Sequence, residues 1–87
     1  MNIRFLCEAL NYFNQKASFN KWQVTINNIK MIVRDNVIYS DFGRTSFHGA
    51  KEFLMIMFFE GVLVNCDRDS ILLYYNNLVN KNSFVAK

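Results

Sequence analysis

The chain has 87 residues, of which 52% are hydrophobic and 20% are charged, and its formal net charge is +3. This composition excludes an intrinsically disordered chain, because disordered segments combine low hydrophobicity with high net charge. The length suits one hydrophobic core, so we predict a single domain over residues 1–87. No uninterrupted run of about 18 apolar residues is present, and the N-terminus lacks a signal-peptide pattern, so we expect a cytoplasmic protein without a membrane span.

Two patterns of apolar residues follow one another in the first half of the chain. Ile3, Leu6, Leu10 and Phe13 recur at helical spacing and predict an amphipathic first helix. Residues 21–42 then alternate with a period of two, with two-residue turns predicted at 27–28 (Asn-Asn) and 35–36 (Asp-Asn). This pattern predicts a three-stranded antiparallel meander whose first strand, residues 22–26, lies at an edge.

Two further helices are predicted in the second half. Thr45 or Ser46 is expected to cap a helix that Gly61 ends, and this helix is apolar on most of its surface. Residues 62–66 fit either a short strand or a continuation of the helix. Asp67 or Asp69 caps a last helix. The predicted fold class is α+β, with an N-terminal helix, a three-stranded antiparallel meander, and two C-terminal helices packed on one sheet face.

This element order, with a hydroxyl before the second long helix, is similar to the double-stranded-RNA-binding domain over roughly residues 3–60. Ser46, Ala50 and Lys51 match the family's phosphate-binding helix start. Phe47 and His48 stand where the family has paired lysines, and the turn at 27–28 is tighter than the family's minor-groove loop. The resemblance implies an alternative nucleic-acid-binding site at Ser46 and Lys51, and we add the nearby cation Arg44 to this predicted site.

Catalytic chemistry has little support in the sequence. His48 is the only histidine, and neither Cys7 nor Cys66 sits in a recognisable nucleophile motif. Asp67 and Asp69 lack a third nearby acid that could complete a metal site. We therefore predict a protein that is not an enzyme and needs no cofactor or metal, with both cysteines reduced.

The positive charge lies in the first half of the chain. Residues 1–44 hold six Lys and Arg against three acids, whereas residues 45–87 hold four of each. The register of the meander directs a basic surface with an apolar centre away from the predicted helices. We predict that this surface binds a partner through Lys21, Lys30, Ile32, Arg34, Val37 and Tyr39.

These observations lead to a functional hypothesis. The bias toward Asn, Lys, Ile, Phe and Tyr is typical of AT-rich coding DNA, in which phages and mobile elements encode many small proteins without catalytic motifs. We expect an inhibitor of the anti-CRISPR type that acts in the host cytoplasm by covering a host protein or nucleoprotein complex. The alternative is a small RNA- or DNA-binding domain. We also expect a homodimer, formed by pairing of strand edges or by a helical contact, because the open sheet face carries apolar residues.

Overall fold

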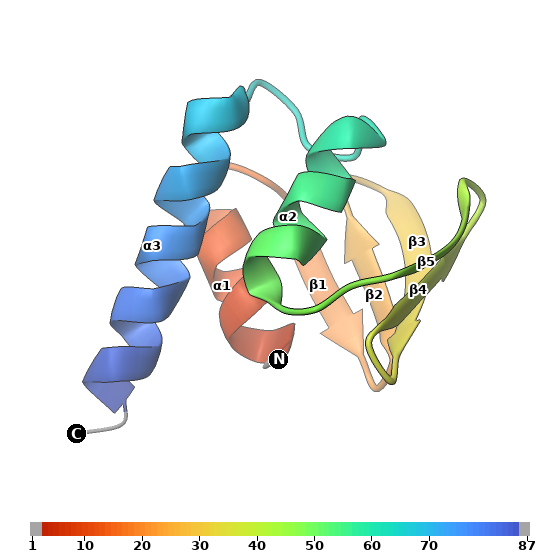
Figure 1. The fold of residues 1–87 in the computed structure, drawn as a ribbon, viewed down its shortest axis with the longest axis horizontal. Helices are drawn as coiled ribbons and strands as arrows, with labels where there is room; N and C mark the ends of the chain where they lie inside the picture. The colour runs from red at the N-terminus through yellow and green to blue at the C-terminus, as the bar shows by residue number, and fades with distance from the viewer. Residues whose placement is uncertain (1–2, 86–87) are drawn as a thin grey trace.

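The computed structural model describes residues 3–85, and side chains are described to residue 80. Within these residues the chain forms three helices and one sheet of five antiparallel strands (Figure 1). The elements in chain order are α1 (Ile3–Tyr12), β1 (Ala17–Asn20), β2 (Gln23–Ile26), β3 (Ile29–Arg34), β4 (Val37–Ser40), β5 (Gly43–Ser46), α2 (Ala50–Phe59) and α3 (Arg68–Val85). The α+β class is confirmed. The prediction of three strands is wrong, because β1 and β5 extend the meander at both ends.

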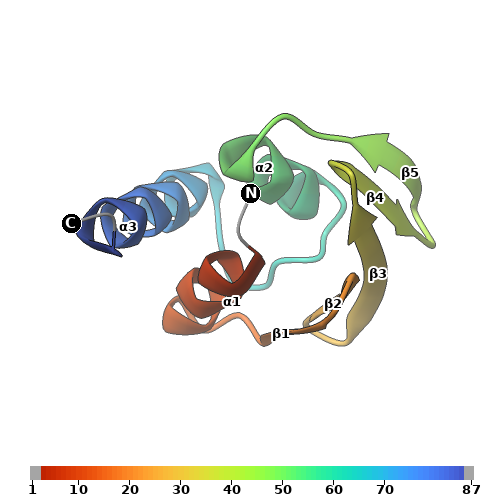
Figure 2. The same ribbon diagram turned by 90° about the horizontal axis from the view of Figure 1, so that it is seen from below.

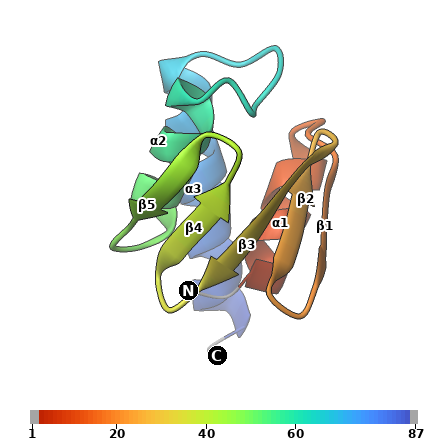
Figure 3. The same ribbon diagram turned by 90° about the vertical axis from the view of Figure 1, so that its right-hand side faces the viewer.

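The elements form three layers (Figure 2). The sheet curves around α1 and α2, and α3 lies on the far side of these two helices. The prediction that both C-terminal helices pack on the sheet is therefore wrong for α3, which packs against α1 and α2 instead. One face of the sheet is covered by helices, and the other, which we call the outer face, is uncovered (Figure 3).

The two predicted hairpin turns are confirmed. The turn residues Asn27, Asn28, Asp35 and Asn36 all have φ values between 50° and 70°, which Asn and Asp tolerate better than most residues. The register between β2 and β3 pairs Val24 with Met31, as predicted. Strands run in the sequential order β1 to β5, so the edges are β1 and β5. The expectation that residues 22–26 form an edge is wrong, because β1 pairs with β2.

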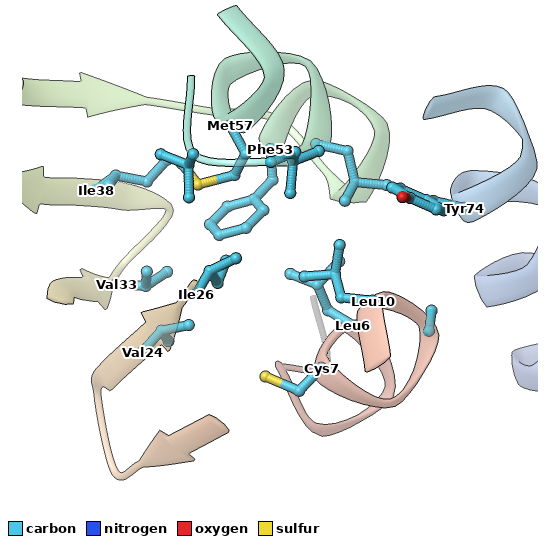
Figure 4. Packing of buried hydrophobic residues seen from close by; sticks show 14 of the residues in the cluster. Leu6, Cys7, Leu10, Val24, Ile26, Val33, Ile38, Phe53, Met57 and Tyr74 are labelled. Carbon is cyan, nitrogen blue, oxygen red and sulfur yellow. The ribbon is translucent and has the colours of Figure 1, made fainter. Parts of the chain in front are cut away.

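The core lies between the inner face of the sheet and the two helices that cover it (Figure 4). Leu6 and Leu10 of α1 meet Phe53 of α2, and Ile26 and Ile38 complete the cluster from the sheet. All five side chains have 0% exposure. Burial of such a side chain contributes about 1.5–3 kcal/mol, so this inner face supplies much of the driving force for folding.

A buried polar cluster joins three distant segments of the chain. The side chain of Gln15, 2% exposed, follows α1. Its Nε2 donates to the Tyr74 hydroxyl at 2.9 Å and to the carbonyl of Val64 at 2.7 Å. Its Oε1 accepts hydrogen bonds from the backbone N–H of Val64 and from Asn27 Nδ2 at 2.9 and 2.7 Å. Asn27 also donates to the carbonyl of Val62. These bonds hold residues 62–66, which form neither the short strand nor the helix that the sequence left open.

Of the two caps predicted for the last helix, Asp67 and Asp69, the structure shows Asp67 at the start of α3. Asp67 Oδ1 accepts a hydrogen bond from the backbone N–H of Ser70 at 3.0 Å and another from its hydroxyl at 3.1 Å. These bonds, the backbone one first, lower the pKa of Asp67. The carboxylate therefore satisfies a backbone donor that the first turn of a helix leaves without an intrahelical partner.

Candidate functional site at the outer face of the sheet

Strand alternation builds the outer face. Val24, Ile26, Met31, Val33 and Ile38 point inward and are buried, so the residues between them point away from the helices. Five of the six predicted partner-binding residues lie on this face, and they come from the two strands at the centre of the sheet: Lys30, Ile32 and Arg34 on β3, and Val37 and Tyr39 on β4. Lys21 lies in the turn between β1 and β2, with a φ of 56°.

A row of paired residues crosses the outer face from edge to edge. The register aligns the residues Asn20, Gln23, Ile32, Tyr39 and Arg44, one from each strand. Ile32 and Tyr39 are directly opposite each other and both are 42% exposed. Amides therefore occupy one end of the row, an apolar pair its centre, and a cation the other end. Cross-strand neighbours of this kind contact each other, so the row is a continuous surface.

Two arginines stack on exposed aromatic rings. The guanidinium carbon of Arg44 lies 5.6 Å from the centre of the Tyr39 ring. That of Arg34 lies 4.2 Å from the centre of the Trp22 ring, and its Nε is also 3.7 Å from Asp35 Oδ2. Stacking fixes these long side chains against flat rings, so less conformational entropy is lost when they bind a partner. Each pair presents an apolar ring beside a cation that can bind a carboxylate or a phosphate in a bidentate manner.

The electrostatic character of the sheet is positive. Residues 17–46 contain four cations, Lys21, Lys30, Arg34 and Arg44, against two acids, Asp35 and Asp41, which gives a net charge of +2. All six residues are exposed, and both acids lie in turns, at the ends of the strands. The centre of the outer face is therefore free of negative charge, and it suits a partner whose contacting surface is acidic.

The outer face is also hollowed beside the central row. A shallow depression of about 210 Å³ is lined mainly by residues of β3 and β4, with Gln23 from β2 and Asp41 from the following turn: Gln23, Lys30, Met31, Ile32, Tyr39, Ser40 and Asp41. Depressions of this size accept one side chain of a partner, and interface energy concentrates where such an anchor is buried. Ile32 and Tyr39 supply apolar walls, and Lys30 and Asp41 supply one charge of each sign.

The alternative nucleic-acid site is not assembled as predicted. Ser46 belongs to β5, where it pairs with Val37, so it does not cap α2. The N-cap of α2 is Gly49, with no side-chain hydrogen bond. Arg44 lies on the outer face, whereas Lys51 is in the first turn of α2, with its Nζ 6.0 Å from the centre of the Tyr75 ring. The resemblance to the double-stranded-RNA-binding domain therefore does not hold. It required Ser46 to precede a helix after three strands, whereas Ser46 lies in a further strand, β5.

The remaining reactive side chains do not form a catalytic arrangement within the described residues. Both cysteines are free thiols. Burial, reinforced by Glu8, raises the pKa of Cys7 to about 11, so this thiol is protonated at neutral pH and is a poor nucleophile. In the described part of the chain, no three His, Cys, Asp or Glu side chains are grouped as metal ligands would be. Among the same residues, the apolar length of each helix falls short of a bilayer crossing.

The predicted partner-binding set left out two exposed residues that form arginine–ring pairs, Trp22 and Arg44. Residue 22 was predicted as the start of the edge strand 22–26, but Trp22 lies in the turn before β2, where its carbonyl accepts a hydrogen bond from the Val33 N–H and its 52% exposed ring stacks with Arg34. Arg44 was predicted only as part of the alternative nucleic-acid-binding site, and the structure places it on β5 beside Tyr39. No alternation of buried residues marks β1, because Ala17 is half-buried and the other three residues of the strand are exposed, so the turn that holds Trp22 could not be placed from the sequence. No protein-family model, curated protein or solved structure matches the chain.

Proposed function

We propose that the protein is a non-enzymatic interaction protein that uses the outer face of its sheet to cover an acidic surface on a macromolecular partner. The observation that carries this proposal is the central row, in which Ile32 and Tyr39 form an apolar centre beside Arg44. An apolar centre with a cationic rim is the composition of a protein-binding surface. The aliphatic side chain of Ile32 favours a protein partner, because it offers no ring on which a base could stack.

The biological role that fits this proposal is inhibition of a host protein or nucleoprotein complex, as an anti-CRISPR protein encoded by a phage or mobile element does. The chain's small size, its AT-rich coding bias and its cationic binding face support this role. A protein of this kind acts by occupying a surface, so its activity requires only affinity and the correct shape. Its place of action is the host cytoplasm.

The proposal is tested by capture of binding partners from a lysate of bacteria with AT-rich genomes, with the captured proteins identified by mass spectrometry. The wild-type protein is compared with a Lys30→Glu, Arg34→Glu variant, whose fold is checked by circular dichroism. Exposed charge reversals change stability little. We expect the variant to lose the captured protein, by at least about tenfold in affinity for two interfacial charges. Equal capture by the folded variant would place the interface elsewhere on the molecule.

A second candidate function is binding of single-stranded nucleic acid. The two arginine–ring pairs, Arg44 on Tyr39 and Arg34 on Trp22, favour it, because bases stack on both rings and guanidinium planes. Fluorescence anisotropy with a labelled oligonucleotide separates the two functions. Binding to nucleic acid would weaken steeply as salt rises, since phosphate contacts release counterions, whereas a largely apolar protein interface would respond weakly.

A further inference from the structure

The exposed side of α3 is apolar where a water-facing helix is normally polar. Ile71, Tyr74 and Leu78 pack this helix against the rest of the molecule. On the opposite side, Leu72, Leu73 and Val79 are 45%, 56% and 40% exposed, respectively. Asn76 and Asn80 lie among them on the same side, at helical spacing. Because α3 is the outermost layer of the molecule, opposite the sheet (Figure 2), these three aliphatic side chains lie on the outside of that layer.

The part of this exposed side that residues 71–80 form also lacks charge, whereas Arg68 and Asp69 in the first turn of α3 are exposed. Residues 71–80 contain no Lys, Arg, Asp or Glu, and their polar side chains are those of three asparagines and two tyrosines. Contact between two copies of such a face brings no like charges together. The outer face of the sheet differs, because stacking two copies of it would bring Lys30, Arg34 and Arg44 of one copy against the same cations of the other. Of these two faces, that of α3 is therefore the one suited to a second copy of the chain.

The sequence of α3 is compatible with a two-fold axis. An antiparallel crossing of two α3 helices near Asn76 places Leu72 and Leu73 of one copy alongside Val79 of the other. The two Asn76 side chains then meet at the axis, where each amide can donate to and accept from the other. A single polar pair within an apolar helix interface fixes its register.

We propose that the protein forms a symmetric homodimer through the exposed side of α3. Because the sheet and α3 lie on opposite sides of the molecule, this dimer leaves both outer faces uncovered and directed away from each other (Figure 2). Two binding faces on one particle raise the effective affinity for a partner with repeated sites by about 10²–10⁴ when the geometry allows both to bind. The inference goes beyond the proposed function and does not depend on it, since it uses none of the sheet residues.

Size-exclusion chromatography with light scattering tests the dimer. We expect the wild-type protein to have twice the 10.3 kDa mass of one chain at micromolar concentration. A Leu72→Glu, Leu73→Glu variant should elute as a folded monomer, because its carboxylates would then be buried against apolar side chains of the other copy without partners of opposite charge. Ile32→Glu is the control, since it replaces an exposed aliphatic side chain by a carboxylate on the outer face and should leave the dimer intact. A wild-type monomer, or a folded Leu72→Glu, Leu73→Glu dimer, would overturn the proposal.

Disulfide cross-linking tests the predicted position of the axis. An Asn76→Cys substitution in a Cys66→Ser background should give a covalent dimer within minutes of mild oxidation, because two cysteines at a two-fold axis lie within disulfide range. Gln23→Cys in the same background is the control, and it should stay monomeric on a denaturing gel. Efficient cross-linking of Gln23→Cys, with none at Asn76→Cys, would assign the contact to the sheet instead of α3.

Discussion

The two faces of the same sheet have opposite physical characters. On the inner face, Val24, Ile26 and Ile38 have 0% exposure and contact the helices. On the outer face, Ile32 and Tyr39 are close to half exposed and are surrounded by cations. Strand alternation alone separates the two sets, so adjacent residues of one strand serve different purposes. The difference shows how a short chain can bury one face of its sheet to fold and leave a second, apolar and basic face exposed.

The largest expected effect comes from a matched pair of isoleucines on neighbouring strands. Ile38→Ala removes a fully buried side chain and should lower the free energy of unfolding by about 2–5 kcal/mol. Ile32→Ala, on the outer face, should cost about 1 kcal/mol or less. Urea denaturation of both variants measures the difference. Similar losses in the two variants would mean that the outer face stabilises the fold as much as the inner face does. That result would contradict the contrast between the two faces of the sheet.

A smaller effect is expected at the buried polar cluster, which sharpens the comparison between buried and exposed amides. Gln15→Leu keeps the volume but removes four hydrogen bonds, and it leaves the backbone groups of Val64 without their side-chain partner. The free energy of unfolding should fall by about 1–3 kcal/mol. Gln23→Leu, an exposed amide on the outer face, is the control and should be near neutral. If Gln15→Leu is equally neutral in urea denaturation, the cluster does not anchor residues 62–66 as described.

The smallest effect is expected at Asp67, the exposed N-terminal cap of α3, which belongs to neither face of the sheet. Hydrogen bonds from Ser70 lower the pKa of Asp67 in the folded protein below its ordinary value of 3.8. A carboxylate with a lowered pKa contributes stability above the unfolded value and loses it as pH falls through the folded value. Asp67→Ala should therefore lower the melting temperature at pH 7, and the difference should shrink as pH falls below 3.8.

Asp69→Ala provides the control for this cap, because it removes the same charge from the first turn of α3 without removing the bonds to Ser70. Its effect on the melting temperature at pH 7 should be smaller than that of Asp67→Ala. A loss at Asp67 that persists unchanged at low pH would show that the ionised carboxylate is not the stabilising species.

The centre of the sheet was predictable because local chemistry decides it. Asn27 and Asn28 tolerate positive φ, and a two-residue turn fixes the register of the strands on either side. The outward positions of Lys30, Ile32 and Tyr39 follow from that register. The sequence therefore located most of the candidate site, including its apolar centre.

The ends of the sheet were not predictable in the same way. β1 and β5 are four residues long and carry mostly exposed, polar or small side chains, so no alternation of buried residues reveals them. Thr45 and Ser46 are frequent helix caps, which favoured a helix start over a strand. The position of α3 over α1 and α2 depends on tertiary packing, and hydrophobic periodicity gives no information about which layer a helix joins. Arg44 was predicted for the alternative nucleic-acid site and not for the outer face for this reason, because its place on the sheet depends on β5.

The central claim is that the outer face binds the partner while the inner face maintains the fold. The most direct measurement compares partner capture by the wild-type protein and by an Ile32→Ala, Tyr39→Ala variant, after urea denaturation has established that both are folded. The account predicts that the variant loses most of the captured partner, because a central apolar pair typically carries much of an interface's binding energy. Undiminished capture by the folded variant would contradict it.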